Sequence, residues 1–141
     1  MFDKKYEERL LLWRDFRESL EISQDPLQDV VDYYSLAPIV NIQTDPYTQS
    51  LWPTPWEILR DNLYCDFVKI LAISYTLQLC ERFKDTRFEI NIVRDDTRSS
   101  KEYHLIVDGM CIGYDQQYVV PVSKIPSNYV LETSYVMPKM N

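Results

Sequence analysis

Glycine and histidine are scarce in this chain of 141 residues. Its only glycines are Gly109 and Gly113, and its only histidine is His104. The Rossmann fingerprint and the P-loop both need several glycines to bring backbone N–H groups onto phosphates, so the sequence excludes them. One histidine and three cysteines, at spacings that fit no zinc finger, also argue against a structural zinc site. We therefore expect no metal and no cofactor.

The chain also lacks clusters of basic residues and long apolar runs. Its formal net charge is −7, which argues against nucleic acid and against an anionic membrane surface as partners. The most apolar stretch, residues 67–79, is too short and too polar to cross a bilayer. The N-terminus is charged and lacks the apolar core of a signal peptide, and the cysteine count is odd. These features predict free thiols in a reducing compartment, the cytoplasm.

The first part of the sequence predicts helices. Apolar residues recur at spacings of three and four over residues 3–23 and 26–36. The segment 54–57 has the pattern of a capping box, which predicts a helix start. Residues 63–83 are apolar on most sides, which is typical of a buried central helix; an unbroken helix from Pro55 is the alternative.

The second part predicts an antiparallel sheet of four or five strands. The first strand begins at Phe88, and further strands are expected at residues 103–107, 110–114, 118–122 and 129–136. The order of elements, helices first and then strands, indicates an α+β fold. We expect a single domain over residues 1–141, with a helical part at 3–83 and a sheet at 87–136.

One hairpin brings polar residues together. With Asp108-Gly109 as a two-residue loop, Leu105 faces Ile112 and His104 faces Gly113. His104 and Asp115 then lie diagonally on one side of the sheet. Such a pair can act as a base and the group that orients it.

A thiol completes the set. Cys65 falls in the first turn of the predicted central helix, where unpaired N–H groups favour a thiolate, although the neighbouring Asp66 opposes it. If that helix end packs on the face carrying His104, Cys65 is the nucleophile, His104 the base and Asp115 the orienting group. The alternative is that all three are structural: free cysteine is commonly a small core residue, and short motifs recur by chance.

The same residues resemble a known family. Cysteine at a helix start, histidine on a strand and aspartate on the next strand occur in this order in the transglutaminase-like group of the papain-type cysteine peptidase fold. The resemblance spans residues 63–115 and implies that fold, with a catalytic Cys65, His104 and Asp115. The matching segments are Tyr64-Cys65-Asp66, Tyr103-His104-Leu105-Ile106-Val107-Asp108-Gly109 and Ile112-Gly113-Tyr114-Asp115.

A second resemblance lies upstream, in Asp45-Pro46-Tyr47 and in the segment 52–57, followed by Tyr64-Cys65. These segments look like short proteins of tailed phages of marine bacteria, which implies a location in the virion or the host cytoplasm.

Aromatic residues and prolines in this upstream region suggest a groove for a protein or peptide. Trp52 and Trp56, with Tyr64 beside the cysteine, are the predicted binding residues; the alternative is that they anchor a loop on the core. The connection at residues 38–53 is long, as functional covers often are.

Three hypotheses follow. A non-enzymatic protein-interaction or assembly role on a related or degenerate version of this fold is favoured. The alternatives are a thiol hydrolase or acyltransferase that acts on a peptide or amide, and an unrelated α+β domain in which the triad does not assemble.

Overall fold

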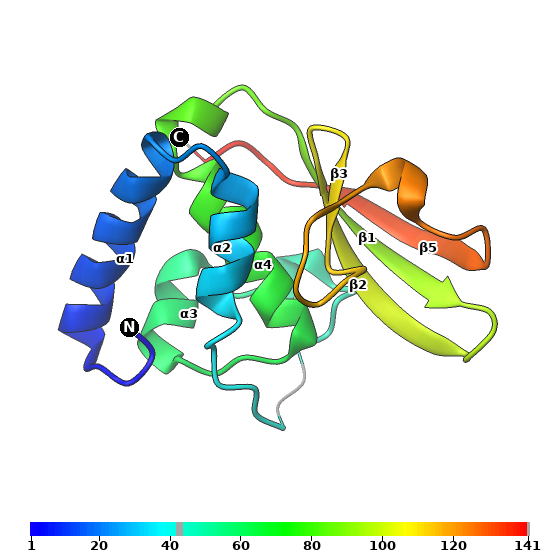
Figure 1. Ribbon diagram of the computed structural model, residues 1–141. Helices are drawn as coiled ribbons and strands as arrows, with labels where there is room; N and C mark the ends of the chain where they lie inside the picture. The colour runs from blue at the N-terminus through cyan, green and yellow to red at the C-terminus, as the bar shows by residue number, and fades with distance from the viewer. Residues whose placement is uncertain (42–43, 141) are drawn as a thin grey trace.

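One buried helix connects the helical layer to the sheet in the computed structural model, which describes residues 1–41 and 44–140 (Figure 1). The described helices are α1 (Tyr6–Glu21), α2 (Pro26–Tyr34), α3 (Pro55–Asp61) and α4 (Asp66–Gln78). They pack against a five-stranded antiparallel sheet in the order β4-β3-β2-β1-β5. The strands are β1 (Phe88–Asp95), β2 (Ser100–Val107), β3 (Met110–Ile112), β4 (Val120–Pro121) and β5 (Tyr129–Val136). This arrangement confirms the predicted α+β class.

Side-chain caps begin two of the helices as predicted. The Asp25 carboxylate accepts a hydrogen bond from the Gln28 N–H at the start of α2. Thr54 and Glu57 form the reciprocal bonds of a capping box at the start of α3. Each cap satisfies N–H groups that have no partner within the helix, so the sequence fixes these boundaries locally.

The break between α3 and α4 corrects one prediction. Asn62 ends α3 in the left-handed conformation, with a φ of 52°. The next helix begins only at Asp66, so the alternative of one unbroken helix from Pro55 is wrong. Cys65 is the residue that precedes the first turn of α4, rather than a member of that turn.

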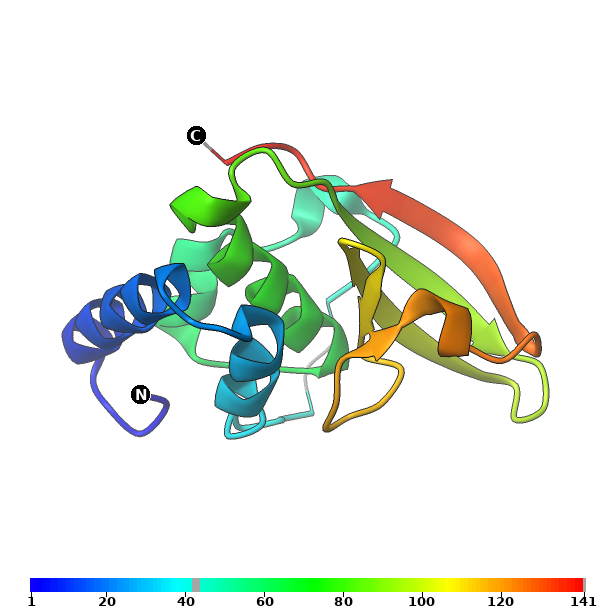
Figure 2. The ribbon, with the colours of Figure 1, turned by 45° about the horizontal axis from the view of Figure 1, so that its top comes forward.

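Helix α4 is central because it is apolar on most of its surface. Ten of its residues are buried, among them Phe67, Leu71 and Leu77. The helix packs against β1 and β2 on one side and against α2 and α3 on the other (Figure 2). In the described part of the chain, no helix combines the length and the apolar character needed to cross a membrane.

The hairpin of β2 and β3 has the predicted register. Leu105 pairs with Ile112, Ile106 with Cys111 and Val107 with Met110. However, β3 ends at Ile112, two residues earlier than predicted, and the predicted strand 118–122 contributes only Val120–Pro121. The first half of β2, residues 100–104, therefore pairs with β1 on one side and extends beyond β3 on the other.

Alternation along β2 decides which side chains face the central helix. Leu105 and Val107 belong to the core that surrounds α4, and Tyr103 packs against that core. Because successive side chains in a strand point to opposite faces, Glu102 and His104 point to the other face of the sheet. Two rings meet His104 on that face, that of Tyr114 after β3 and that of Tyr129 at the start of β5.

Gly113 allows a close approach next to β2. Its φ is +111°, and a Cβ atom there would overlap the carbonyl oxygen of Tyr103. Gly109 also has a positive φ, +74°, but a Cβ atom on it would meet nothing within 4 Å. Comparing alanine substitutions at the two glycines therefore distinguishes the cost of the positive φ from the cost of steric overlap.

We expect Gly113→Ala to lower the free energy of unfolding by about 3 kcal/mol, because left-handed strain and overlap both oppose it. Gly109→Ala carries only the strain and should cost about 1 kcal/mol. Urea denaturation of the two variants measures this difference. Equal costs would contradict the close approach of Gly113 to Tyr103.

Candidate functional site

Cys65 lies at the start of the buried helix. It is a free, partly buried cysteine, and its carbonyl accepts the hydrogen bond from the Lys69 N–H that opens α4. Its side chain makes no capping hydrogen bond. The first turn of α4 contains Asp66, whose negative charge opposes formation of a thiolate nearby. The structure thus places Cys65 at the N-terminus of α4, directly before the first turn in which it was predicted to lie.

Tyr103 is the residue of β2 that faces this helix end. Its ring packs edge-on against Phe67, with ring centroids 5.3 Å apart. Burial raises the pKa of the Tyr103 phenol, and the nearby Tyr47, Cys65 and Asp66 raise it further. Cys65 therefore lies within electrostatic reach of a phenol. A phenol whose pKa is raised is not a general base at neutral pH.

His104 lies one residue further along, on the opposite face. It is 1% exposed, and its Nε2 is hydrogen bonded to Glu102 Oε1 at 3.0 Å. The hydroxyl of Tyr129 donates to the other oxygen of Glu102 at 2.9 Å. The rings of Tyr114 and Tyr129 lie against the imidazole. His104 is thus part of a buried polar cluster that joins β2 to β5.

Asp115 has a different role from the predicted one. Its Oδ1 accepts hydrogen bonds from the N–H groups of Gln117 at 2.8 Å and Tyr118 at 3.1 Å, which shape the turn after β3. The carboxylate that orients His104 is Glu102, in place of the predicted Asp115. Over residues 1–41 and 44–140, no hydrogen bond joins Cys65, His104 and Asp115 to one another.

The predicted binding aromatics are also separated. Trp52 is 9% exposed and packs between Phe67 and Tyr135, and Tyr64 is fully buried. Trp56 is 51% exposed and contacts Trp13. Trp52 and Tyr64 thus anchor their segments on the core, which was the alternative interpretation of this cluster.

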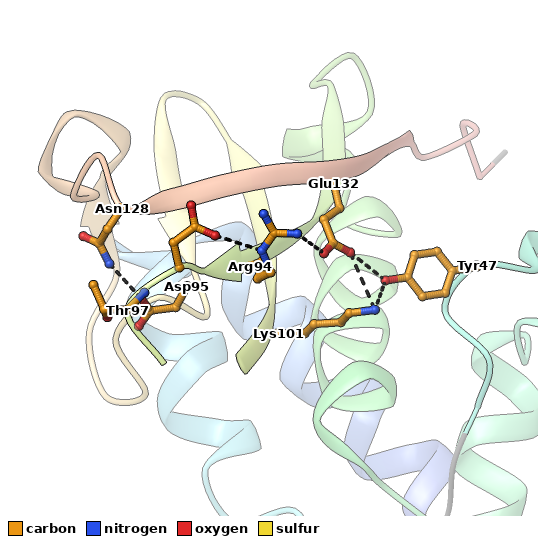
Figure 3. A network of polar contacts seen from close by, with 8 residues as sticks. Tyr47, Arg94, Asp95, Thr97, Lys101, Asn128 and Glu132 are labelled. Carbon is orange, nitrogen blue, oxygen red and sulfur yellow. Dashed lines mark hydrogen bonds and ion pairs between the residues drawn. The ribbon is translucent and has the colours of Figure 1, made fainter. Parts of the chain in front are cut away.

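The long connection before α3 is attached around the start of α4. The Val40 N–H donates to the Tyr64 carbonyl, and the Trp52 ring contacts Phe67. Between these points, Tyr47 reaches the sheet (Figure 3). Its hydroxyl donates to Glu132 at 3.0 Å and accepts from Lys101 at 2.7 Å.

The polar contacts of Figure 3 extend along the sheet from Tyr47. Glu132 also pairs with Arg94, and Asp95 separately accepts from Thr97 and Asn128. These hydrogen bonds lower the pKa of the Asp95 carboxyl. The network therefore fixes the connection and the turn between β1 and β2 at one end of the sheet.

A cavity of about 470 Å³ opens next to this site, between α4, β2 and the turn after β3. Lys101, Glu102 and Tyr103 line it from β2, and Lys69, Ile70 and Ile73 line it from α4. Its other lining residues are Val31, Asp66, Arg98, Ile112, Gly113, Tyr114, Asp115, Gln116 and Tyr129. In the described part of the chain, no group of three or more His, Cys, Asp or Glu residues is arranged to hold a metal ion.

Sequence reasoning missed three residues at this site: Tyr103, Glu102 and Lys69. The signal for the first two is present in the alternation of β2. Its odd positions, Tyr103, Leu105 and Val107, are more apolar than its even positions, so the odd positions are expected to face a buried helix.

Comparison with known proteins supports the fold. No family model and no curated protein matches the sequence. Among solved structures, calcium-bound LapG of Legionella pneumophila is similar over 94% of this chain and 77% of its own, with 16% identity and a TM-score of 0.61. This likeness supports the transglutaminase-like, papain-type fold that the motifs implied. The phage resemblance stays a prediction.

The cluster around Glu102 predicts a dependence of stability on alkaline pH. Burial, followed by the hydrogen bond to Glu102, raises the pKa of Tyr129 to about 12. In the unfolded chain a tyrosine ionises near pH 10, so the stabilising contribution is complete below about pH 10 and is lost as the pH rises towards 12.

We expect Tyr129→Phe to lower the free energy of unfolding by about 1 kcal/mol at pH 8, because Glu102 loses a donor. Between pH 8 and pH 11 the variant should lose less stability than the wild type. Urea denaturation at both pH values tests this, with the exposed Tyr118→Phe as the control. An identical loss in wild type and Tyr129→Phe would refute the assignment.

Proposed function

We propose that this chain is a non-catalytic protein-binding domain that has the transglutaminase-like fold without a working Cys–His pair. The observation that carries the proposal is the orientation of β2, which turns Tyr103 towards the start of α4 and His104 away from it. Nucleophilic catalysis by a thiol needs a base within hydrogen-bond reach. Here the imidazole is buried on the other face and is bound to Glu102.

The alternative is a cysteine hydrolase or acyltransferase that uses Cys65, His104 and Asp115. The position of Cys65 before a buried helix favours it. For His104 to reach Cys65, however, β2 would have to shift by one residue. Such a shift moves every side chain of the strand to the other face and would expose Leu105 and Val107, which are now 0% and 1% exposed. The core therefore opposes this arrangement.

The partner that suits a non-catalytic role is a protein or peptide, as the sequence predicted. The cavity beside α4 combines apolar residues with charged ones, which is typical of recognition sites. An assembly role in a phage particle or in the cytoplasm of its host belongs to this proposal, and rests on the resemblance of the upstream segments.

The reactivity of Cys65 tests the proposal. Burial raises the pKa of Cys80 and of Cys111 to about 11, so these thiols should react slowly in the folded protein. Mass-spectrometric mapping of iodoacetamide adducts at pH 7 then follows Cys65 in the native chain. We expect His104→Gln, which keeps a side chain of similar size, to change its alkylation rate by less than twofold.

Tyr103→His is the complementary variant, which should increase the reactivity of Cys65. An imidazole at this position would face Cys65, so we expect the alkylation rate to rise about fivefold or more, as a nearby base promotes thiolate formation. Tyr103→Phe removes the phenol without adding a base and serves as the control. A tenfold or greater loss of rate in His104→Gln, with the fold intact by circular dichroism, would instead support the catalytic alternative.

A further inference from the structure

The free edge of β2 forms one wall of the cavity. The last residue pair between β2 and β3 is Leu105 with Ile112, so β3 does not pair with residues 100–104. Gly113 lies against the Tyr103 carbonyl, and the edge before Tyr103 has no neighbour among the described strands. Lys101, Glu102 and Tyr103 are consecutive, and all three line the cavity. Because consecutive side chains alternate between faces, a cavity lined by all three must reach the edge of the strand itself.

The main chain at this edge has unused hydrogen-bonding groups. The Tyr103 carbonyl points towards Gly113 and therefore away from β1. In an antiparallel strand the N–H and C=O groups of every second residue point to the same side, so those of Lys101 also face the cavity. In the described residues, these Lys101 groups have no backbone partner outside the β1–β2 ladder.

The wall opposite this edge is apolar and carries one unpaired cation. Val31, Ile70 and Ile73 supply its apolar surface. Lys69 lies among them and is half-buried, and within residues 1–41 and 44–140 its ammonium group makes no hydrogen bond or ion pair. An ammonium group that has no protein partner and borders a cavity can take a carboxylate as its ligand.

The acidic residues that line the cavity do not pair with Lys69. Glu102 already accepts hydrogen bonds from His104 and Tyr129, and Asp115 from two backbone N–H groups. Asp66 is exposed, and no ion pair joins it to Lys69 in the described structure. Lys69 is therefore the charged group of this wall that is left to recognise a ligand.

We propose that the cavity binds an extended peptide segment of a partner protein as a short additional strand on the edge of β2 at Lys101. One apolar side chain of the segment lies against Val31, Ile70 and Ile73, and an acidic side chain two residues away reaches Lys69. Residues two apart in a strand share a face, which fits both contacts to one wall. This inference rests on the proposed function, since it specifies the partner of a non-catalytic domain. Cys65 is not among the cavity-lining residues.

Selection from a random linear heptapeptide display library against the immobilised chain supplies the probe. The selected peptides are synthesised with a fluorescent label, and their Kd values are measured by fluorescence anisotropy. We expect peptides that combine apolar and acidic residues at a spacing of two. Lys69→Met should weaken their binding tenfold or more, and Lys69→Arg should restore most of it.

Lys101→Pro tests the strand edge. Proline removes an N–H that faces the cavity and not β1, so the β1–β2 pairing should persist while peptide binding falls tenfold or more. Because this variant also loses the Lys101 side chain, which contacts Tyr47 and Glu132, Lys101→Met is its matched control and should keep most of the binding. Lys124→Met, at an exposed lysine outside the cavity, is the control for charge, and thermal unfolding verifies the fold of each variant.

Peptides that bind Lys69→Met and Lys101→Pro as tightly as the wild type would overturn the inference, as would a library that yields no binder below a Kd of about 100 µM. Neither result bears on Cys65. Failure of the proposed non-catalytic role is seen separately, as a loss of Cys65 alkylation in His104→Gln.

Discussion

The packing of α4 on β2 determines the rest of this structure. A helix that is apolar on most sides must be covered on most sides, and here the sheet covers one side while α2 and α3 cover the other. On β2, the side chains that meet α4 are Tyr103, Leu105 and Val107. Because the side-chain period of a strand is two, this choice also fixes the position of His104 on the far face. The choice of which face of β2 packs on α4 therefore separates His104, the only histidine, from the thiol of Cys65.

Most of the fold could be predicted from local signals. Each of these signals lies within a few adjacent residues. They are the capping residues Asp25 and Thr54, the Asp108-Gly109 turn and the alternation of apolar and polar residues in the strands. The predicted boundaries are wrong where the end of a helix or strand depends on backbone geometry that the local pattern does not show. β3 stops at Ile112 because Gly113 turns the chain against the Tyr103 carbonyl, and α4 starts at Asp66 because Asn62 closes α3 in a left-handed conformation. Neither event leaves a periodic pattern in the sequence.

The candidate site was predicted less completely, and for a different reason. The predicted register of the hairpin is confirmed. The register determines which residues share a face of the sheet, but it does not determine which face packs on the helix. That second question is answered by comparing the two sets of side chains in β2. The set that contains His104 also contains Glu102, two positions away, and such a pair can satisfy itself without a thiol. The spacing of Glu102 and His104 in β2 therefore predicts this pair, whereas the catalytic motif pairs His104 with Asp115.

On the far face of the sheet, polar contacts hold the buried His104. A buried imidazole is costly unless it is hydrogen bonded, and here Glu102 bridges His104 and Tyr129 through its two carboxylate oxygens. Tyr129 opens β5 and Glu102 lies on β2, so this bridge joins two strands that β1 separates. The ring of Tyr114, which follows β3, packs on the rings of His104 and Tyr129, and Tyr114 also lines the cavity. His104 itself does not line the cavity, so it acts on the shape of the cavity through Glu102, Tyr114 and Tyr129, which do.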